Sequence, residues 1–447
     1  GVLAPNRVEF LELFWACARA GAIFSPLNTR LTAVEMADVV ADLDPLVVCA
    51  DRRLVDRLEL ARDSFTHLVG LDDGDPGLAL PALRAGAGEP VWTAAAPDDT
   101  VAILYTSGTT GRSKGAMITH ANVESQAAGW VQAFDTGSDD RHLLMLPLCF
   151  TGGLMSGAMN PVFSGATIVL RDGFDAGACI ETIATEGVTW LTAVPTMVER
   201  MLRHEDATPE RLASLTRLET GGAPIPVPLV QRAGELGIGI LQGYGLTECT
   251  AGPALFLDAH DAVGKLGSTG KASLNCEVRV VTVDGRDAEL DEVGELLVAG
   301  GIVFKGYWRN DDATRSTIVD GWLHTGDLAR RDADGDHYVV GRLKELIISG
   351  GLNVYPAEVE AALRRVPGIA ETAVAGVADE TWGETVIAWV ITDDPALTEQ
   401  GVIEASRELL ADYKRPKRVV FVEDFPRTSA GKVRKHELRV DQAADVR

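Results

Sequence analysis

A segment rich in glycine and hydroxyl side chains, residues 105–115, offers the most distinctive chemistry in this chain. It reads Tyr-Thr-Ser-Gly-Thr-Thr-Gly-Arg-Ser-Lys-Gly and follows an apolar run, residues 101–104, that we expect to be a buried strand. Glycine lets a backbone approach an anion closely, so N–H groups, hydroxyls and a lysine ammonium can bind phosphate oxygens. We predict a polyphosphate-binding loop with Lys114 as its cation. The other candidate residues of this loop are Thr106, Ser107, Gly108, Thr109, Thr110 and Gly111.

The spacing differs from that of the common mononucleotide-binding loop. That pattern needs a glycine, four residues, and then Gly-Lys followed by Ser or Thr. Here Lys114 follows Ser113 and precedes Gly115. A glycine-rich surface turn is the alternative for so short a motif, and the motifs that follow along the chain argue against it.

Five further segments carry residue types that suit a nucleotide and an activated acid. They are 221–224 (Gly-Gly-Ala-Pro), 242–248 (Gln-Gly-Tyr-Gly-Leu-Thr-Glu), 322–328 (Trp-Leu-His-Thr-Gly-Asp-Leu), 341–351 (Gly-Arg-Leu-Lys-Glu-Leu-Ile-Ile-Ser-Gly-Gly) and 426–432 (Pro-Arg-Thr-Ser-Ala-Gly-Lys). A Gly-Gly-x-Pro turn or a lone Asp in a turn is ordinary by itself. The interpretation as a nucleotide site rests on the order in which all six segments occur along the chain.

These segments resemble the motifs of the adenylate-forming superfamily, which includes acyl-CoA synthetases, luciferases and nonribosomal-peptide adenylation domains. The resemblance extends over nearly the whole chain. It implies an acid–thiol ligase in which a carboxylate attacks the α-phosphorus of MgATP and releases pyrophosphate. The CoA thiol then displaces AMP from the acyl-AMP. ATP, Mg²⁺ and CoA are the implied cofactors and co-substrates, and a small carboxylic acid is the implied substrate.

The resemblance also implies roles for single residues. Tyr244 would stack on adenine, Thr247 would contact the α-phosphate, and Glu248 would be a ligand of Mg²⁺. Asp327 would accept hydrogen bonds from both ribose hydroxyls, which suits an acceptor-only carboxylate. Lys432 would bridge the carboxylate and the α-phosphate, where a preorganised cation stabilises developing charge. With Lys432, the implied catalytic residues are Thr247, Glu248 and Lys114.

Other residues are implied to bind the nucleotide and the CoA arm. Gly222, Ala223 and Pro224 would lie against adenine, together with Gly243 and Gly245. Arg342 would contact the nucleotide, Lys344 would be the hinge about which the small domain rotates, and Gly350 and Gly351 would run beside pantetheine.

The acyl pocket departs from the family pattern. Many acyl-CoA ligases read Pro-Leu-Phe-His before Gly-Gly, whereas this chain has Phe150 in the histidine position. An aromatic gate can work by shape but lacks polar contact with the carboxylate. An adenylating enzyme with a non-CoA acceptor is therefore the alternative, through amide formation or through ATP-dependent nitrite activation and diazotisation of an aryl amine. The candidate pocket residues are Phe150, Thr151, Gly152, Gly245 and Cys249.

A nucleotide-binding regulator without catalysis is a third reading, and it predicts that catalytic groups are missing. Lys114, Glu248, Asp327 and Lys432 are all present, so this reading is disfavoured.

Length and composition predict a globular protein of about two or three domains, with 447 residues of which 46% are apolar. The net charge of −24 argues against a general nucleic-acid binder, and no apolar run reaches transmembrane length. Residues 414–435 include eight basic and two acidic side chains, which fits either a nearby anionic ligand or a solvated charged face. Six cysteines without paired spacing indicate reduced, mostly buried thiols in a cytoplasmic protein. The resemblance also allows a homodimer.

Alternating strand and helix patterns predict an α/β fold. We expect a large N-terminal domain of layered α/β sheets with a small β-barrel-like subdomain, followed by a small mobile α+β domain. The predicted domains are 1–341, which lacks the first segment usual in the family, and 342–447. Strands are expected at 46–49, 167–170 and 189–194, helices at 195–202, 356–366 and 399–413, and a hairpin turn at 332–336.

Overall fold

The computed structural model describes residues 1–72, 78–89, 92–106, 113–222, 225–427 and 433–438. Within these ranges, no helix is long and apolar enough to cross a membrane. The chain divides into two compact units, which we call the large unit and the small unit. The large unit comprises Gly1–Arg279, Leu297–Thr325 and Asp332–Tyr338, and the small unit comprises Val280–Leu296, Gly326–Arg331 and Val339–Arg447.

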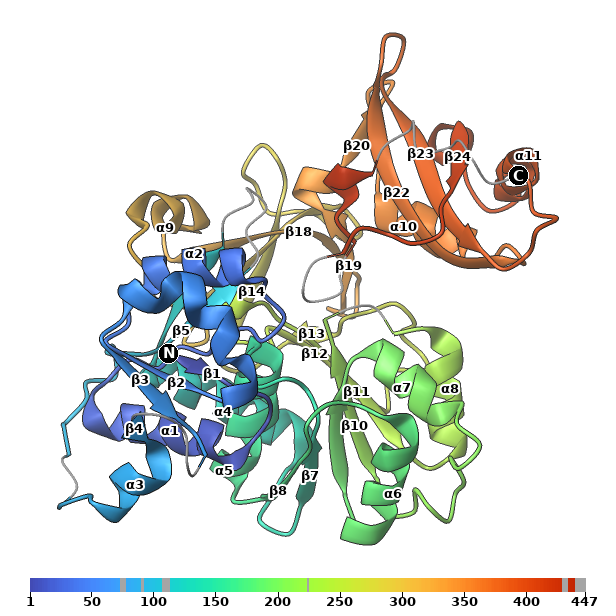
Figure 1. Cartoon of the computed structure of the whole chain (residues 1–447). Coiled ribbons are helices and arrows are strands. Elements are labelled where there is room, and N and C mark those ends of the chain that lie inside the picture. The colour runs from blue at the N-terminus through green and yellow to red at the C-terminus, as the bar shows by residue number, and fades with distance from the viewer. Residues whose placement is uncertain (73–77, 90–91, 107–112, 223–224, 428–432, 439–447) are drawn as a thin grey trace. The chain divides into compact units, whose positions relative to one another are not determined.

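A seven-stranded sheet in the large unit leads into the candidate segments near Gly222 and at 243–249 (Figure 1). Its strand order is β13-β12-β11-β10-β9-β7-β8, and the five strands from β8 to β11 run parallel, while β12 and β13 are antiparallel. The parallel layering and two of the strands expected from the sequence are thereby confirmed. The bounds are β7 Arg141–Leu144, β8 Thr167–Leu170, β9 Trp190–Ala193, β10 Arg217–Gly221, β11 Gly239–Tyr244, β12 Leu255–Leu257 and β13 Lys271–Ala272.

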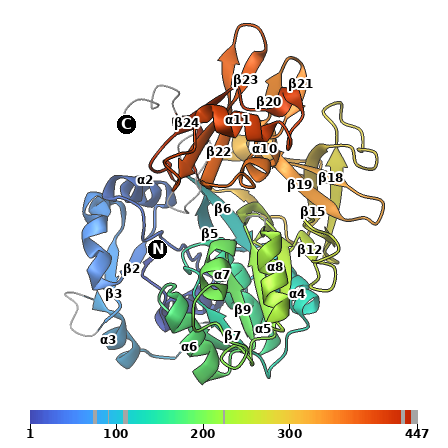
Figure 2. The ribbon, with the colours of Figure 1, turned by 90° about the vertical axis from the view of Figure 1, so that its right-hand side faces the viewer.

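The two faces of this sheet are covered by different helices. Side chains alternate along a strand, so Leu143, Leu191 and Leu218 share one face and pack in a common core. That core includes the helices α6 (Ala176–Glu186), α7 (Pro195–Leu202) and α8 (Val227–Glu235), seen beside the strands in Figure 2. The opposite face meets α4 (His120–Phe134), the π-helix Gly152–Met159 and α5 (Asn160–Ser164).

Two smaller sheets complete the large unit. One has the order β1-β2-β3-β4 with parallel pairing, and packs with the helix α2 (Ala33–Leu43) in one core. The other has the order β16-β6-β5 and packs with the buried helix α1 (Val8–Ala20). The bounds are β1 Val2–Leu3, β2 Val47–Ala50, β3 His67–Gly70, β4 Leu78–Ala79, β5 Thr100–Thr106, β6 Lys114–Thr119 and β16 Gly306–Tyr307.

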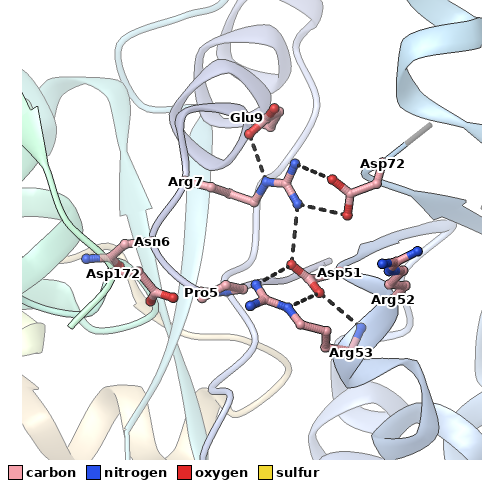
Figure 3. Close-up of a pocket in the computed structure, with 9 residues that line it drawn as sticks. All are labelled: Pro5, Asn6, Arg7, Glu9, Asp51, Arg52, Arg53, Asp72 and Asp172. Atoms are coloured by element: carbon pink, nitrogen blue, oxygen red, sulfur yellow. Dashed lines mark hydrogen bonds and ion pairs between the residues drawn. The ribbon is translucent and has the colours of Figure 1, made fainter.

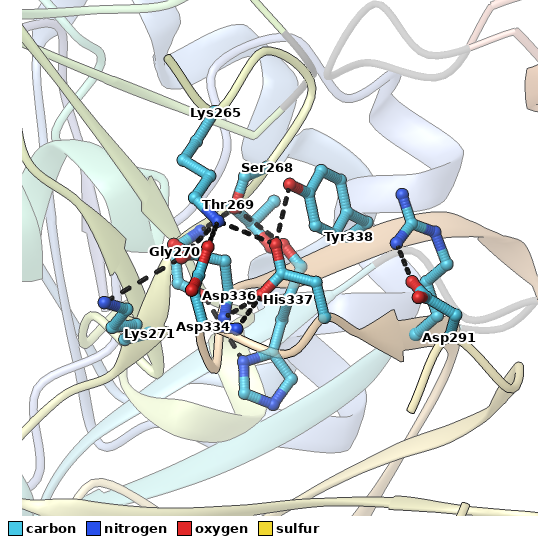
Figure 4. A network of polar contacts seen from close by, with 12 residues as sticks. Lys265, Ser268, Thr269, Gly270, Lys271, Asp291, Asp334, Asp336, His337 and Tyr338 are labelled. Carbon is cyan, nitrogen blue, oxygen red and sulfur yellow. Dashed lines mark hydrogen bonds and ion pairs between the residues drawn. The ribbon is translucent and has the colours of Figure 1, made fainter. Parts of the chain in front are cut away.

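A further sheet has the order β14-β15-β18-β17, with β19 paired to β18. Its strands are β14 Cys276–Val281, β15 Gly294–Gly300, β17 Ile318–Val319, β18 Trp322–Arg331 and β19 His337–Arg342. Residues 332–336 connect β18 to β19 by the expected hairpin turn, in which Gly335 N donates to Asp332 O at 3.1 Å. Lys265 Nζ meets three carboxylates of this turn, at 2.9 Å from Asp332 and 3.4 Å from Asp336 (Figure 4). One ammonium group therefore offsets part of the negative charge of this turn.

The small unit contains a five-stranded sheet of order β21-β20-β23-β22, with β24 paired to β23. Helices α10 and α11 pack in a core with one face of this sheet, which confirms an α+β unit. The helix expected at 399–413 is wrong in its second half, because α11 ends at Ser406, whose hydroxyl donates to Ile403 O at 2.6 Å. The bounds are β20 Ile347–Ser349, β21 Leu352–Val354, β22 Ile369–Asp379, β23 Gly383–Thr392, β24 Arg418–Phe421, α10 Pro356–Leu363 and α11 Glu399–Ser406.

Candidate active site

The predicted phosphate-binding segment joins two paired strands. Strands β5 and β6 are antiparallel, with Thr106 opposite Lys114 and Tyr105 opposite Gly115. A Cβ on Gly115 would lie 2.7 Å from Ile103 Cγ2, so only glycine lets the two strands approach this closely. Thr106 and Lys114 are half-buried at the strand ends. The candidates Ser107, Gly108, Thr109, Thr110 and Gly111 lie outside the described residues.

Lys114 and Glu248 meet through a third residue, Tyr307 on β16. Lys114 Nζ lies 5.0 Å from the centroid of the Tyr307 ring, within the range of a cation–π contact. The Tyr307 hydroxyl donates to Glu248 Oε1 at 2.7 Å. Burial, together with the Glu248 carboxylate, raises the pKa of Tyr307 far above its ordinary value, so the phenol stays a proton donor. Three segments distant in sequence thus converge on one cation and one carboxylate.

Thr247 connects this cluster to the predicted acyl pocket. Thr247 and Glu248 begin a short 3₁₀ turn, Thr247–Cys249, just after β11. The hydroxyls of Thr247 and Thr151 are hydrogen-bonded at 2.8 Å. Phe150 precedes Thr151 and is half-buried, with Arg30 Cζ 5.9 Å from its ring centroid. Cys249, the last residue of this turn, is fully buried.

The chain enters a π-helix, Gly152–Met159, immediately after Thr151. Such turns are rare and frequently occur at functional sites. The helix begins with two different glycines. A Cβ on Gly153 would lie 2.2 Å from Pro147 O, whereas one on Gly152 would meet no described atom within 4 Å. Gly152 therefore borders open space, while Gly153 is packed against backbone.

The ends of β10 and β11 form a surface made of backbone. Gly221 pairs with Gly243, and a Cβ on Gly243 would lie 2.3 Å from the Trp130 ring. A Cβ on Gly245 would lie 2.4 Å from Gly252 O. Gly222 has a φ of +78° and open space beside it. A flat base could lie on such a surface at the carboxyl edge of a parallel sheet, where ligands of α/β proteins bind. Tyr244 is half-buried at the end of β11, and Ala223 and Pro224 lie outside the described residues.

The small unit holds the remaining candidates. Asp327 is buried and its Oδ1 is 2.8 Å from Arg342 Nε, so the two predicted nucleotide contacts form an ion pair. Lys344 lies in the exposed 3₁₀ turn Leu343–Glu345. Gly350 and Gly351 connect β20 to β21 with φ of +58° and +79°. A Cβ on Gly350 would lie 2.8 Å from the Trp382 ring. Lys432 lies outside the described residues.

Sequence reasoning missed two residues of this region. Tyr307 follows a lysine and a glycine and precedes a tryptophan, and this aromatic pair at a glycine was the available signal. Glu219 is a carboxylic acid within the buried strand β10, two residues before Gly221. A charged residue between Leu218 and Thr220 in a short strand was the signal there.

A cavity of about 560 Å³ near the start of α1 contains none of the predicted site residues (Figure 3). Arg7 contacts Glu9 at 2.8 Å, Asp72 at 3.0 Å and Asp51 at 3.3 Å. The hydrogen bond from Arg53 lowers the pKa of Asp51 to about 2. The lining of this cavity holds four carboxylates (Glu9, Asp51, Asp72 and Asp172) against three arginines (Arg7, Arg52 and Arg53), so it lacks the surplus cationic charge of a phosphate site.

Comparison with known proteins identifies the family. Residues 1–308 match the AMP-binding enzyme family, and residues 358–432 match the AMP-binding enzyme C-terminal domain. The chain belongs to the AMP-binding enzymes, within the adenylate-forming superfamily that its motifs resemble.

Three curated relatives are similar over nearly all of this chain. The indoleacetate–CoA ligase of Aromatoleum aromaticum is 38% identical over 98% of this chain and 87% of its own length. A feruloyl-CoA synthase of an Amycolatopsis species is 38% identical over 98% and 87%. The long-chain-fatty-acid–CoA ligase FadD13 of Mycobacterium tuberculosis is 37% identical over 100% and 88%.

Solved structures share the fold. ATP-bound MatB from Rhodopseudomonas palustris has a TM-score of 0.89 at 34% identity, covering 97% of this chain and 86% of that chain. The o-succinylbenzoate CoA synthetase of Bacillus subtilis with its acyl-adenylate has a TM-score of 0.89 at 30% identity, covering 100% and 88%. The same enzyme with ATP and a magnesium ion has a TM-score of 0.87 at 31% identity, covering 98% and 88%. The expected fold class is confirmed.

The donor set in the large unit suits MgATP. Among the described residues, no group of three or more His, Cys, Asp or Glu side chains could hold a metal ion. Mg²⁺ characteristically binds one or two carboxylates and completes its shell with substrate phosphates and water. Glu248 supplies one carboxylate close to the Lys114 ammonium, which matches that mode.

Proposed function

We propose that this protein is an ATP-dependent carboxylate:CoA ligase that forms an acyl-AMP intermediate and releases AMP and pyrophosphate. The observation that carries the proposal is the convergence of Lys114 and Glu248 on Tyr307, next to the Thr247–Thr151 hydrogen bond. A cation and a metal-binding carboxylate there lie beside the turn that leads into the acyl pocket. The similarity to several CoA ligases supports the same activity.

In the first step a carboxylate oxygen attacks the α-phosphorus and pyrophosphate leaves. Lys114 would neutralise charge on the phosphates, Glu248 would hold Mg²⁺, which supplies further positive charge there, and Thr247 would donate to an α-phosphate oxygen. Lys432 stabilises the charge that builds up as two anions approach each other. Asp327 binds the ribose diol, which suits its acceptor-only carboxylate, and Arg342 orients Asp327 by the ion pair.

In the second step the CoA thiolate attacks the acyl carbon and AMP leaves. We assign the C-terminal domain to residues 342–447, rotating about Lys344, because the thiol then needs the place that Lys432 occupied. We assign the pantetheine path to Gly350 and Gly351 at the end of β20, where Gly351 borders open space and Gly350 packs against the Trp382 ring. We further assign a cytoplasmic location and no nucleic-acid partner, based on the cysteine pattern and the negative net charge.

A non-CoA acceptor is the competing function, because Phe150 replaces the histidine that many CoA ligases carry. Two observations favour CoA. The relatives at 37–38% identity are CoA ligases. Arg30 lies beside the Phe150 ring, so a cation is close to the pocket without the histidine.

The test is pyrophosphate release with ATP, Mg²⁺ and a panel of aliphatic and aromatic acids, with and without CoA. We expect acid-dependent pyrophosphate, and AMP together with loss of free CoA thiol when CoA is present. Lys432→Ala should reduce pyrophosphate release by about 10²-fold or more, equivalent to several kcal/mol of charge stabilisation. Lys417→Ala removes an exposed lysine of the same basic segment and should leave the rate unchanged. Acid-dependent pyrophosphate without any acyl-CoA, or turnover with nitrite, would support the competing function.

A further inference from the structure

A chain of buried polar side chains lies on the face of the seven-stranded sheet that meets the π-helix. Glu219 on β10 has 4% of its surface exposed and accepts hydrogen bonds from Ser156 of the π-helix and from Thr192 on β9. The Thr192 hydroxyl is 2.7 Å from Glu219 Oε2 and 2.9 Å from His142 Nε2 on β7. The network thus crosses three adjacent strands.

The strand register puts this network directly below the predicted acyl pocket. Glu219 and Gly221 are alternate residues of β10 and share one face, roughly 7 Å apart along the strand. Gly221 is paired with Gly243, so neither strand has a side chain at this position, and the Trp130 ring packs over Gly243. Ser156 follows Gly152 by about one helical turn, and the space beside Gly152 is open. The entrance of the predicted pocket and the network therefore lie on the same face of the seven-stranded sheet, at different positions along the strands.

The hydrogen-bond inventory shows what this network can still bind. Thr192 has one hydroxyl proton, and with an ionised Glu219 that proton belongs to the carboxylate. His142 must then donate from Nε2 to Thr192, and its ring also contacts the Gly157 backbone. The Ser156 proton also goes to Glu219. Every donor is used inside the network, and the lone pairs of the Glu219 and Ser156 oxygens remain.

The helices over this face carry further polar groups in need of a partner. Gln126 on α4 and Asn160 on α5 are fully buried, and none of their amide atoms has a hydrogen-bond partner among the described residues. Gln126 lies one turn before Trp130, whose ring packs against Gly243, and Asn160 lies one turn after Ser156. Native proteins pair almost all buried polar atoms, so these two amides are available to a water molecule or to a polar ligand.

We propose that the His142–Thr192–Glu219–Ser156 network is the floor of the acid pocket and selects carboxylic acids that carry a hydrogen-bond donor, a hydroxyl or an N–H, at the end remote from the carboxyl group. This inference rests on the proposed function. An alkyl end would leave Glu219 buried against carbon, which is costly for a carboxylate. Indoleacetate and ferulate, named for two relatives, both carry such a donor, whereas a fatty acid does not.

The test compares matched acids that differ only in the remote donor. The pairs are 4-hydroxycinnamate with cinnamate, and indole-3-acetate with naphthalene-1-acetate. We expect kcat/KM for pyrophosphate release to favour the donor-bearing acid by at least about 10-fold, because a site built for a donor rejects the analogue that lacks it. In Glu219→Leu the preference should disappear or reverse, and kcat/KM for the donor-bearing acid should fall by about 10–100-fold.

Two readouts separate selection from loss of structure. Asp140→Asn removes another buried carboxylate, bonded to Arg217 at the opposite end of β10, and should leave the preference intact. Ser156→Ala and Thr192→Val should each weaken the preference with smaller effects. Calorimetric titration of each acid in the presence of α,β-methylene-ATP should give the same order of Kd values without catalysis.

The outcomes distinguish this inference from the function itself. Equal or better use of the acids without a donor would overturn the inference and leave the ligase activity standing. An unchanged preference in a folded Glu219→Leu protein would overturn it too. Absence of pyrophosphate with every acid would count against the proposed function instead, and the calorimetric Kd values would then decide the inference alone.

Discussion

The Tyr307 hydroxyl donates a hydrogen bond to Glu248 Oε1 at 2.7 Å, while the same ring faces the Lys114 ammonium. One side chain thus orients the carboxylate that we propose to bind Mg²⁺ and also contacts the lysine that we propose to bind phosphate. Tyr307→Phe keeps the ring and removes only the hydroxyl. We expect kcat for pyrophosphate release to fall by about 10–100-fold, in line with one hydrogen bond to a charged group, and the Mg²⁺ concentration at half-maximal rate to rise. A Mg²⁺ titration of the initial rate measures both.

Tyr338→Phe is the matched control. The Tyr338 hydroxyl donates to Asp332 at 3.1 Å in the hairpin turn, so Tyr338→Phe removes a similar contact elsewhere in the protein. Its Mg²⁺ requirement should equal that of the unmodified protein. A Tyr307→Phe enzyme with unaltered Mg²⁺ dependence would show that Tyr307 does not position Glu248.

The two glycines that open the π-helix should behave in opposite ways when replaced by alanine. At Gly153 the new methyl would collide with Pro147 O, so we expect a loss of about 3 kcal/mol or more in the free energy of unfolding. At Gly152 the methyl enters open space, so stability should change by less than about 1 kcal/mol. Gly152→Ala should instead lower kcat/KM for bulky acids. Urea denaturation and a series of acids of increasing width measure the two effects, and equal destabilisation by both changes would contradict the assigned packing.

Glu219 should make stability depend on pH in a way that glutamine abolishes. Burial raises its pKa to about 7 in spite of the hydrogen bonds from Ser156 and Thr192. The unfolded chain has the ordinary lower value, so between about pH 4.5 and 7 the folded state binds more protons and loses stability as the pH rises. Above pH 7 the folded state carries the full free-energy cost of burying the ionised Glu219 side chain, on the order of 3 kcal/mol.

The Tm difference between Glu219→Gln and the unmodified protein should therefore increase from pH 5 to pH 7.5. Burial lowers the pKa of the neighbouring His142 to about 3, which makes stability rise up to about pH 6.5. That contribution is common to both proteins and cancels in the difference, as does the Arg217–Asp140 pair on the same face. A pH-independent difference would mean that Glu219 titrates normally.

Lys435 should be structural where Lys432 is catalytic. Lys435 Nζ is 2.8 Å from both Glu345 and Glu360, in the turn beside the predicted hinge and in α10. Lys435→Ala leaves these two carboxylates without their cation, so we expect a loss of about 1–3 kcal/mol in the stability of the small unit. Lys432→Ala should leave stability unchanged and reduce pyrophosphate release by about 10²-fold or more. Thermal unfolding measured beside pyrophosphate release separates the two, and a stable Lys435→Ala protein would refute the structural assignment.

The cysteines should react slowly in the native protein. No disulfide joins the six cysteines, all of which lie in the described residues, and four of them are buried. Burial raises the pKa of Cys179 to about 12 and that of Cys276 to about 11, so little thiolate forms at pH 8. A chromogenic disulfide reagent should label all six at once in denaturant and none rapidly in buffer. Rapid labelling of any thiol in the native protein would contradict the burial of these side chains.

Local patterns in the sequence were sufficient to predict most elements of the fold. Residues 101–104 form a continuous apolar run, and all four are buried in β5. Pro195 preceded a periodic segment, and α7 begins there because proline suits the first turn of a helix. The helix expected after Glu399 failed at Ser406, where a side-chain hydrogen bond ends it, since such local contacts leave no periodic signal.

The motifs identified the residues that we propose to bind the nucleotide, but not the contacts that position those residues. Lys114 and Glu248 each lie in a recognisable string, whereas Tyr307 comes from a two-residue strand whose role depends on tertiary contacts. The Glu219 network was equally inaccessible, because Ser156 and Thr192 are ordinary residues until the register of three strands aligns them. The two units contribute different candidates. The roles of Asp327 and Arg342 remain predictions, and Lys432→Ala tests the role of Lys432.

The extra residue per turn in the π-helix Gly152–Met159 gives this protein an unusual route to new chemistry. Deleting one residue upstream of Ser156 would convert the segment to an ordinary helix and turn every later side chain by about 100°. The hydroxyl above Glu219 would swing away and another side chain would replace it, with no change in the sheet. Diversification of such pockets could therefore proceed through single insertions and deletions, leaving the nucleotide-handling residues as they are.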